Sequence, residues 1–489
     1  MTPKKITPEL IAILDGREMG RVTRDNRARL TFTYNEDWRT AENAYPLSIS
    51  MPLALAQHAN ARIDTFLWGL LPDNQLVLDQ WARKFHVSAR NAFSLISAVG
   101  EDCAGAVQFV RPERLEAILG AVPPEIEWLT EANIAQRLRA LREDHSAWRI
   151  PRDTGQFSLA GAQPKTALLF ENGRWGVPSG RIPTTHILKP PLGEFAGHAE
   201  NEHFCLELAR ALGLPVVDSR IMRFGDEVAI VVERYDRIRT DAGLRRVHQE
   251  DICQALGIPP TSKYQNEGGP GIRDIVELLR TYSGSAAEDV RTFLDSVAFN
   301  WLIVGTDAHA KNYALLIGSG GRVRLAPMYD LASVFPYPRI DIKRVKLSMK
   351  LGGEYRFRNI QIRHWRRQAE ELGVNPDELV HRVDELDAAD RPCSRGRAPH
   401  DRRRVYTSPH SPAGWQAHHA RGGMSETLAR MIRSSSLIYS RADQAHARRA
   451  LWPDGRLVVS AIRQQFDRGN QQPNCRSTHS LHRNVAAKD

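Results

Sequence analysis

The first 112 residues alternate short apolar runs with turn residues, and Gly, Asp and Asn separate the first three runs. Strands are therefore predicted at residues 11–14, 20–22 and 30–34. Helical spacing follows at residues 75–81, where we expect Asp73 to cap a helix, and again around residues 92–96. A further strand is predicted at residues 106–110. The pattern predicts a small mixed α/β module over residues 1–112, in which no catalytic residue stands out.

Residues 113–149 are more polar and include a Pro-Pro pair, which predicts a linker with an amphipathic helix. Apolar runs resume over residues 150–390. Strands are predicted at residues 166–169, 185–189 and 230–236, and a hairpin at residues 313–325. Helices are predicted at residues 200–212, from residue 248, around 275–279 and over the apolar stretch 293–306.

The composition is that of an ordinary globular protein. The chain has 489 residues, of which 42% are hydrophobic, enough for the cores of two or three domains. No apolar run approaches the roughly 20 residues of a membrane span, so we expect a cytoplasmic protein without membrane contact. The five cysteines are scattered and never spaced as C-x-x-C, which argues against a disulfide framework or a zinc site and favours single buried thiols.

The net charge of +10 is unevenly distributed. Residues 391–489 hold 18 Lys and Arg against 6 Asp and Glu, whereas residues 1–390 hold 49 against 51. Total charge therefore gives no evidence for a nucleic-acid surface on the first 390 residues. Of the 18 basic residues after residue 390, 17 are arginine, and this stretch has no helical period. We expect a disordered tail whose composition resembles an out-of-frame translation more than a genuine basic arm.

Acidic residues with the spacing of a phosphoryl-transfer site follow the apolar stretch 293–306. Asp307 and Asn312 form an Asp-x-x-x-x-Asn loop, and Asp330 comes eighteen residues after Asn312. A kinase needs one carboxylate to orient the attacking hydroxyl and take its proton, and further oxygen ligands to hold Mg²⁺ against the phosphates. An Asp that merely ends a helix is the alternative. The predicted hairpin, which would return Asp330 to the loop, favours a kinase.

Two further segments could bind phosphates. The loop SLAGAQPK at residues 158–165 combines small residues, which let backbone N–H groups approach phosphate oxygens, with the charge of Lys165. It lacks the Walker pattern, and a plain hairpin is the alternative. Lys189 ends a predicted strand, and a helix that opens at residues 200–202 and carries Glu202 follows, which is how kinases position a phosphate-binding lysine. A surface lysine and an acid placed by the helix dipole are the alternatives.

The β-branched run 230–236 suits a buried strand that continues into an adenine-binding hinge, where Tyr235 could stack on the base. A core strand followed by a surface turn explains the same residues equally well.

Eight motifs occur in a fixed order along the chain: SLAGAQPKTALL, TTHILKPP, NEHFCLELARALGL, VVERYDR, QEDICQALG, KYQNEGGPGI, WLIVGTDAHAKNYALL and LAPMYDLASVFP. In this order they resemble the HipA family of bacterial serine/threonine kinases, and the similarity covers roughly residues 8–390. The resemblance implies an α+β, protein-kinase-like two-lobed fold with a small N-terminal mixed α/β module and a helical C-lobe. The implied divisions are residues 1–112, a linker or helical segment at 113–149, the kinase core at 150–390 and the tail at 391–489.

The resemblance also implies the toxin half of a toxin–antitoxin pair. The best-known family member phosphorylates glutamyl-tRNA synthetase with ATP and Mg²⁺ and so arrests growth. Its partner is a small helix-turn-helix antitoxin of the HipB type, through which the complex contacts operator DNA and represses its own operon. Two alternatives stay open for this chain: a small-molecule phosphotransferase, and an inactive partner of the antitoxin.

Carried over by position, Asp307 would be the catalytic base, Asn312 and Asp330 would hold Mg²⁺, and Ser158, expected beside Gly161 and Lys165, would be the autophosphorylation position. The nucleotide would be bound by Ala160, Gly161, Ala162, Gln163, Lys165, Lys189, Glu233, Arg234, Tyr235, His309, Lys311, Asn312, Tyr329 and Asp330. The chain departs from the family in two places. Pro164 replaces an acidic residue, which stiffens the loop and removes an amide donor. After about residue 380 the family continues with amphipathic helices, whereas this chain enters its arginine-rich tail.

Overall fold

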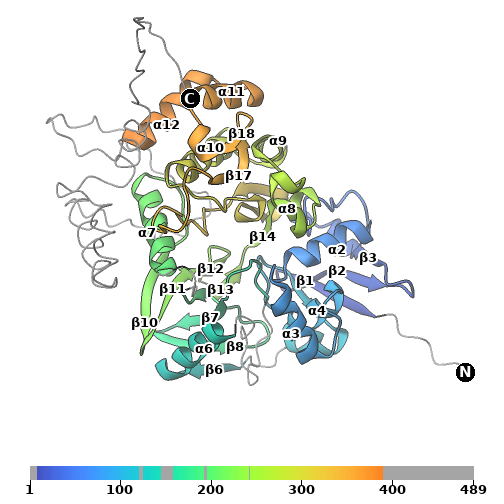
Figure 1. Ribbon diagram of the computed structural model, residues 1–489. Helices are drawn as coiled ribbons and strands as arrows, with labels where there is room; N and C mark the ends of the chain where they lie inside the picture. Colours follow the sequence, from blue (N-terminus) through green and yellow to red (C-terminus); the bar gives the residue numbers. More distant parts are fainter. Residues whose placement is uncertain are drawn as a thin grey trace, which may run out of the picture.

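The computed structural model describes residues 8–120, 125–144, 158–191, 195, 197–241 and 243–388 (Figure 1). They form an N-terminal module that lies beside a two-lobed core. Helices and antiparallel sheets both contribute, so the expected α+β class is confirmed. Cys393, Cys475 and the rest of the tail beyond residue 388 lie outside the described residues.

Five antiparallel strands form the sheet of the N-terminal module in the order β4-β3-β2-β1-β5. They are β1 (Glu9–Leu14), β2 (Arg17–Arg24), β3 (Leu30–Tyr34), β4 (Gln57–Ala59) and β5 (Gln108–Val110). Side chains alternate along β1 because successive residues of a strand point to opposite faces. Leu10, Ala12 and Leu14 join the main core, whereas Ile11 and Ile13 form a second cluster with Ile118. The three strands predicted for the meander are thus present.

The helices of this module are α1 (Glu36–Arg39), α2 (Asn60–Gly69), α3 (Gln75–Phe85), α4 (Ala92–Val99), the short η1 (Pro112–Arg114) and α5 (Leu115–Leu119). The two predicted helices are α3 and α4, but the predicted cap is wrong. Asn74, not Asp73, caps α3 by accepting a hydrogen bond from the Leu76 N–H at 3.0 Å. Asp73 is thereby left for other partners.

The N-lobe is a six-stranded antiparallel sheet in the order β10-β11-β9-β7-β8-β6. Its strands are β6 (Ile126–Leu129), β7 (Thr166–Glu171), β8 (Arg174–Pro178), β9 (His186–Lys189), β10 (Ser219–Phe224) and β11 (Glu227–Glu233). Helices α6 (Glu131–Glu143) and α7 (His198–Ala211) cover opposite faces. Along β11, Ala229 and Val231 belong to the cluster that includes α6, and Ile230 and Val232 to the cluster that includes α7.

The expected linker at residues 113–149 is wrong in part. Its described residues include β6, which pairs with β8 and so belongs to the N-lobe sheet. The predicted helix is α6, which begins with a capping box at Thr130 and Asn133. The N-lobe therefore begins near residue 125 rather than at residue 150.

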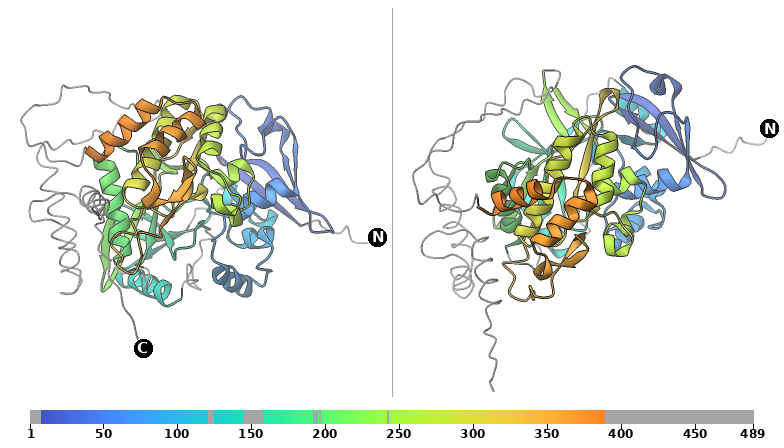
Figure 2. Two further views of the ribbon diagram at one scale, coloured as in Figure 1. Left: turned by 45° about the horizontal axis from the view of Figure 1, so that its top comes forward. Right: turned by 90° about the horizontal axis from the view of Figure 1, so that it is seen from above.

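The C-lobe combines a three-stranded sheet with helices that gather at the top of Figure 1 and appear again in Figure 2. Its strands are β14 (His248–Asp251), β15 (Ala314–Gly318), β16 (Arg322–Leu325), β17 (Lys346–Leu351) and β18 (Glu354–Arg356); β12 (Arg237–Thr240) and β13 (Gly243–Arg246) form a separate hairpin. Its α-helices are α8 (Ile252–Leu256), α9 (Ile272–Tyr282), α10 (Ala286–Leu302), α11 (Ile362–Leu372) and α12 (Pro376–Ala388). Its short 3₁₀ helices are η2 (Pro260–Ser262), η3 (Gln265–Glu267), η4 (Ala310–Asn312), η5 (Ser319–Gly321) and η6 (Phe357–Asn359).

The helix predicted from residue 248 begins later than expected. Residues 248–251 form β14, whose partner β15 lies more than sixty residues away along the chain. Helix α8 starts only at Ile252, capped by Asp251, which accepts a hydrogen bond from the Gln254 N–H at 2.9 Å. A strand of four residues whose partner is distant in the chain has little local sequence signal. The acidic residues at 250 and 251 therefore favoured the prediction of a helix that begins at residue 248.

A buried ion cluster joins the N-terminal module to the end of β11. Asp102 accepts a hydrogen bond from Arg237 at 2.8 Å and lies 3.5 Å from Arg234. Asp236 accepts hydrogen bonds from Arg234 at 2.8 Å and from the Gly105 N–H at 2.7 Å. Breaking one such buried pair costs about 3–5 kcal/mol because it leaves an uncompensated charge. The cluster therefore fixes the module against the N-lobe.

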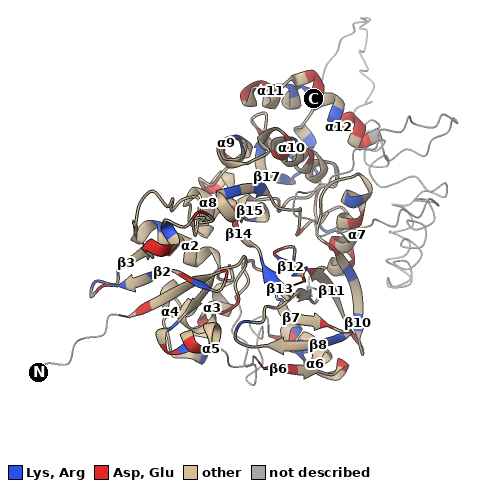
Figure 3. Ribbon diagram, turned by 180° about the vertical axis from the view of Figure 1, so that it is seen from behind, with Lys and Arg blue, Asp and Glu red and all other residues tan. Residues whose placement is uncertain are grey.

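Elsewhere the charged residues of both signs are interspersed over the described elements (Figure 3), in keeping with the near balance of charge in residues 1–390. Cys103, Cys205 and Cys253 are buried free thiols, as expected. Among the described residues, no helix has the length and apolar character needed to cross a membrane.

Candidate active site

The Asp-x-x-x-x-Asn loop begins where α10 ends. Val304 takes φ +56°, which is rare for a β-branched residue. Gly305 follows at a position where a Cβ would lie 2.5 Å from Asn300 Oδ1, so any larger residue would displace the buried Asn300 side chain. Beyond it, Asn312 Nδ2 donates a hydrogen bond to the Asp307 carbonyl oxygen at 2.7 Å. The two ends of the loop are thus tied together.

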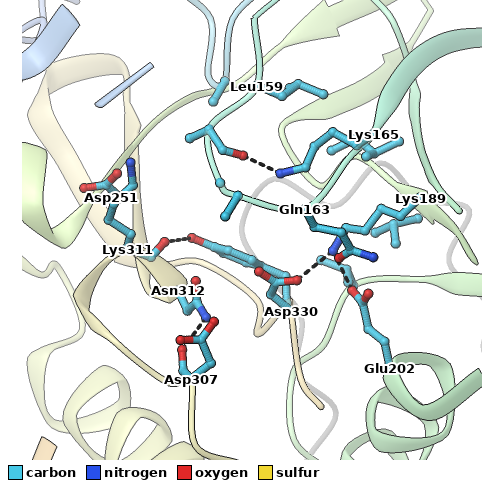
Figure 4. A pocket seen from close by; sticks show the side chains of 18 of the residues that line it. Leu159, Gln163, Lys165, Lys189, Glu202, Asp251, Asp307, Lys311, Asn312 and Asp330 are labelled. Atoms are coloured by element: carbon cyan, nitrogen blue, oxygen red, sulfur yellow. Dashed lines mark hydrogen bonds and ion pairs between the residues drawn. The ribbon is translucent and has the colours of Figure 1, made fainter. Parts of the chain in front are cut away.

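Hairpin β15–β16 returns the chain toward this loop, as predicted from the sequence. Asp330 follows at φ +59°, a left-handed conformation that costs a non-glycine residue about 1–2 kcal/mol. Lys189 Nζ, at the end of β9, donates to Asp330 Oδ1 at 2.7 Å and to Glu202 Oε1 of α7 at 2.7 Å (Figure 4). The pairing of Lys189 with Glu202, left open by the sequence, is therefore present.

The charges of these three residues depend on one another. Burial lowers the pKa of Lys189, but the carboxylates of Asp330 and Glu202 outweigh burial and raise it. Burial raises the pKa of Asp330, yet the positive charges of Lys189 and Lys165 prevail and hold it well below its usual range. The pKa of Glu202 is raised by burial. Lys189 therefore stays cationic and Asp330 anionic around neutral pH.

The predicted phosphate loop borders the same cavity. Lys165 Nζ donates to the Ala160 carbonyl oxygen at 2.5 Å (Figure 4). Gly161 takes φ +104°, and a Cβ there would lie 2.6 Å from Lys165 Nζ, so the loop needs glycine at this position. Burial, together with the charge of Lys189, lowers the pKa of Lys165 to about 8. Ala162, Gln163 and Pro164 of the same loop also line the cavity.

The hinge residues divide into two groups. Glu233 and Tyr235 line the cavity, and the Tyr235 ring stacks on that of Tyr329, with centroids 5.8 Å apart. Tyr329 also donates a hydrogen bond to the Lys311 carbonyl oxygen at 2.9 Å. Arg234, expected at the nucleotide, places its guanidinium in the buried ion cluster with the N-terminal module. Arg234 nevertheless lines the cavity together with Glu233 and Tyr235, so its expected place at the nucleotide stays a prediction.

Residues of both lobes and of the N-terminal module enclose a cavity of about 400 Å³, a size usual for small-molecule sites. Four buried polar atoms of its lining have no hydrogen-bond partner among the described residues: Gln163 Nε2, His198 Nδ1, Glu202 Oε2 and His309 Nδ1. Buried polar groups without partners cost free energy unless a ligand or water satisfies them. The cavity therefore suits a polar ligand.

The donor set also fits Mg²⁺. Asn312 uses its amide nitrogen on the Asp307 carbonyl, which leaves Oδ1 as a free acceptor, and Asp330 adds a carboxylate that stays ionised. Hard oxygen donors of this kind, completed by phosphate and water oxygens, are those that Mg²⁺ prefers. Burial lowers the pKa of His309, so this imidazole is neutral and does not repel a cation.

Asp73 reaches the site from the N-terminal module, and no sequence motif predicted a role for it there. Its carboxylate accepts hydrogen bonds from Lys311 Nζ at 2.7 Å and from Lys263 Nζ at 2.9 Å, and its N–H donates to the Gly161 carbonyl oxygen at 3.1 Å. These lysines lie 238 and 190 residues away. No local pattern could have revealed them.

Ser158 is oriented differently from the expectation. It is fully buried, and its hydroxyl donates to the Leu70 carbonyl oxygen at 2.7 Å rather than facing Gly161 and Lys165. The N-terminal module therefore holds the start of the phosphate loop. Phosphoryl transfer to this hydroxyl requires the segment to leave its present position.

The fold and the site define a kinase-like phosphotransferase: two lobes, a lysine paired with a helix glutamate, and an Asp-x-x-x-x-Asn loop followed by a second aspartate. Comparison with known proteins agrees. Residues 157–392 match the HipA-like C-terminal domain, and residues 10–110 match the HipA N-terminal domain. The chain belongs to the HipA family, and the resemblance seen in its motifs is confirmed.

Two relatives show how far the similarity extends. The putative kinase Y4mE of Sinorhizobium fredii is 38% identical over 379 residues, which cover 76% of this chain and 87% of that protein. The serine/threonine-protein kinase toxin HipA of Shewanella oneidensis is 33% identical over 339 residues, which cover 66% of this chain and 73% of that protein. The structure also matches a chain of the Shewanella oneidensis HipA, HipB and operator DNA complex with a TM-score of 0.67 at 27% identity, covering 78% of this chain and 89% of that one.

Proposed function

We propose that this protein is a Mg·ATP-dependent serine/threonine protein kinase that acts as the toxin of a toxin–antitoxin pair. The observation that carries the proposal is the placement of Lys189 between Glu202 and Asp330, in one cavity with the Asp307–Asn312 loop. Membership of the HipA family, which includes a kinase toxin of Shewanella oneidensis, supports the toxin role. The N-terminal module would span residues 8–120 and the kinase core residues 125–388.

The side chains divide the reaction between them. Asp307 is the base: it accepts the proton of a Ser or Thr hydroxyl as that oxygen attacks the γ-phosphorus of ATP. Lys189 and Lys165 bind and neutralise the phosphates, and the Gly161 segment brings the backbone close to them. Asn312 and Asp330 would hold Mg²⁺, which supplies positive charge to the phosphates. Tyr235 and Glu233 lie where the adenine would bind.

We further propose a small helix-turn-helix antitoxin of the HipB type as the partner. The Shewanella oneidensis structure contains HipA, HipB and operator DNA, and the similarity covers 89% of the matched chain in that complex. Operator DNA would be contacted through that complex, and the operon repressed by it. The family resemblance indicates glutamyl-tRNA synthetase as the protein substrate, and its phosphorylation would arrest growth.

The test is transfer of radiolabel from γ-labelled ATP. The full chain, its Asp307→Asn variant and an Asp384→Asn control, which alters an exposed residue of α12, are incubated with Mg²⁺ and either a bacterial lysate or purified glutamyl-tRNA synthetase. We expect a labelled protein band with wild type and control, and none with Asp307→Asn. Label found only on small solutes would show a small-molecule phosphotransferase. No transfer, with antitoxin binding intact, would show an inactive partner.

A further inference from the structure

Tyr264 contacts the side chain assigned as the catalytic base. Its hydroxyl donates a hydrogen bond to Asp307 Oδ1 at 2.7 Å. Its ring lies edge-on to the imidazole of His309, with centroids 4.9 Å apart and planes at 81°. No described group donates a hydrogen bond to Asp307 Oδ2, and the Asp307 side chain is 66% exposed. One oxygen of the carboxylate is therefore held, and the other is open.

Tyr264 is itself fixed by a rigid frame. Its carbonyl oxygen accepts hydrogen bonds from the N–H groups of Glu267 and Gly269, both at 3.0 Å. A side chain at Gly269 would collide with the Ser262 and Tyr264 backbone, so the turn requires glycine there. The preceding residue, Lys263, is anchored by its ion pair with Asp73 at 2.9 Å. The phenol therefore meets Asp307 from a position that the backbone determines.

We propose that Tyr264 is a positioning residue, which holds Asp307 Oδ1 so that Oδ2 faces the hydroxyl of the protein substrate. This inference rests on the proposed kinase function and adds the group that orients its base. The carboxylate of an Asp rotates freely about its terminal bond unless a donor fixes it. Reaction requires an acceptor oxygen placed within hydrogen-bond distance of the proton it takes.

The proton balance assigns the roles. The Ser or Thr hydroxyl gives its proton to Asp307 Oδ2 while its oxygen bonds to the γ-phosphorus. The bond from that phosphorus to the β–γ bridging oxygen breaks, and its electron pair leaves with ADP. Tyr264 keeps its own proton, because burial and the Asp307 charge raise the pKa of the phenol above its ordinary value. It acts as a donor only and does not replace the base.

The opposite role is a phenol that occupies the place of the substrate hydroxyl and so inhibits the enzyme. Removing the hydroxyl would then increase the rate. The open Oδ2 favours positioning, because a blocking group would leave no acceptor oxygen for the substrate.

The test compares wild type, Tyr264→Phe and the control Tyr282→Phe, which alters an exposed tyrosine at the end of α9. The acceptor is the protein labelled in the lysate experiment, used in purified form. Loss of a hydrogen bond to a charged group should lower the kcat of Tyr264→Phe roughly ten- to a hundredfold. The KM for ATP, the calorimetric nucleotide affinity and the melting temperature should stay close to wild type. Tyr282→Phe should match wild type throughout.

A double variant separates positioning from a general structural role. If Tyr264 acts through Asp307, then adding Tyr264→Phe to Asp307→Asn should lower the rate no further. Equal kcat in wild type and Tyr264→Phe, a faster Tyr264→Phe, or independent effects in the double variant would each overturn the inference while leaving the kinase proposal intact. A wild-type protein that transfers no phosphate would overturn both.

Discussion

Replacing Asp73 by Ala should weaken both the fold and the site. The Asp73 carboxylate is 12% exposed, and its partners Lys311 and Lys263 are 3% and 15% exposed. Removing the carboxylate leaves two mostly buried ammonium groups without their counter-charge. The loss of one partner from a buried ion pair costs about 3–5 kcal/mol, and we expect the free energy of unfolding to fall by this amount. Nucleotide affinity should fall as well, because the Asp73 carboxylate also fixes the side chain of Lys311, which lines the cavity.

The pH dependence of this contribution has a definite sign. Burial raises the pKa of Asp73, but the charges of Lys311 and Lys263 outweigh burial, and the net pKa is lowered. The unfolded chain has an ordinary Asp pKa of roughly 3.9. The stabilisation is therefore fully present above about pH 4 and is lost as the pH falls through the lower pKa of the folded state.

Urea unfolding at pH 7 and at a pH well below 4, with calorimetric titration of Mg·ATP at pH 7, measures both effects. The control is Asp37→Ala, an exposed residue of α1 in the same module. A double-mutant cycle with Lys311→Ala isolates the ion pair and should give a coupling free energy above 1 kcal/mol, in the range of about 0.5–3 kcal/mol found for contacting residues. An Asp73→Ala protein with the unfolding free energy and ATP affinity of wild type would refute the reasoning. A coupling energy near zero would show that the pair does not stabilise the protein.

Three further predictions concern single residues. Asp307→Asn should lower kcat about 10²- to 10⁴-fold and leave the calorimetric ATP affinity nearly unchanged; a near wild-type rate would contradict its assignment as the base. Ser158→Ala should lower the free energy of unfolding in urea by about 1 kcal/mol, because the Leu70 carbonyl loses its donor. Ser158→Asp should in addition bind ATP weakly. Equal ATP affinity in the two variants would exclude a switch at this position. Burial raises the pKa of Glu250 to about 8 despite a hydrogen bond from the Ile49 N–H, so wild type should lose stability as the pH rises from about 4.5 to 8. Glu250→Gln should remove that loss in urea titrations, and an unchanged pH profile would contradict it.

The sequence determined the elements whose signal is local. The alternation of side chains along β11, the periods of α9 and α10, and the turn between β15 and β16 all follow from residues close to one another in the chain. The proximity of Asp307, Asn312 and Asp330 could also be predicted from local sequence, because only one loop and one hairpin separate these residues. Motif order then gave the family, which the comparisons confirmed.

Only the tertiary structure determined which partners the charged and polar side chains of these elements bind. Arg234 lines the cavity, and its guanidinium forms hydrogen bonds in the ion cluster with the N-terminal module. The Ser158 hydroxyl donates a hydrogen bond to the Leu70 carbonyl oxygen. Asp73 does not cap a helix, although its sequence position predicted a cap, and its carboxylate binds Lys311. Each outcome depends on a partner between 88 and 238 residues distant. A buried charged group or hydroxyl pairs with a polar group that the tertiary fold places beside it. The free-energy cost of leaving it unpaired is larger than the free energy of any local sequence preference.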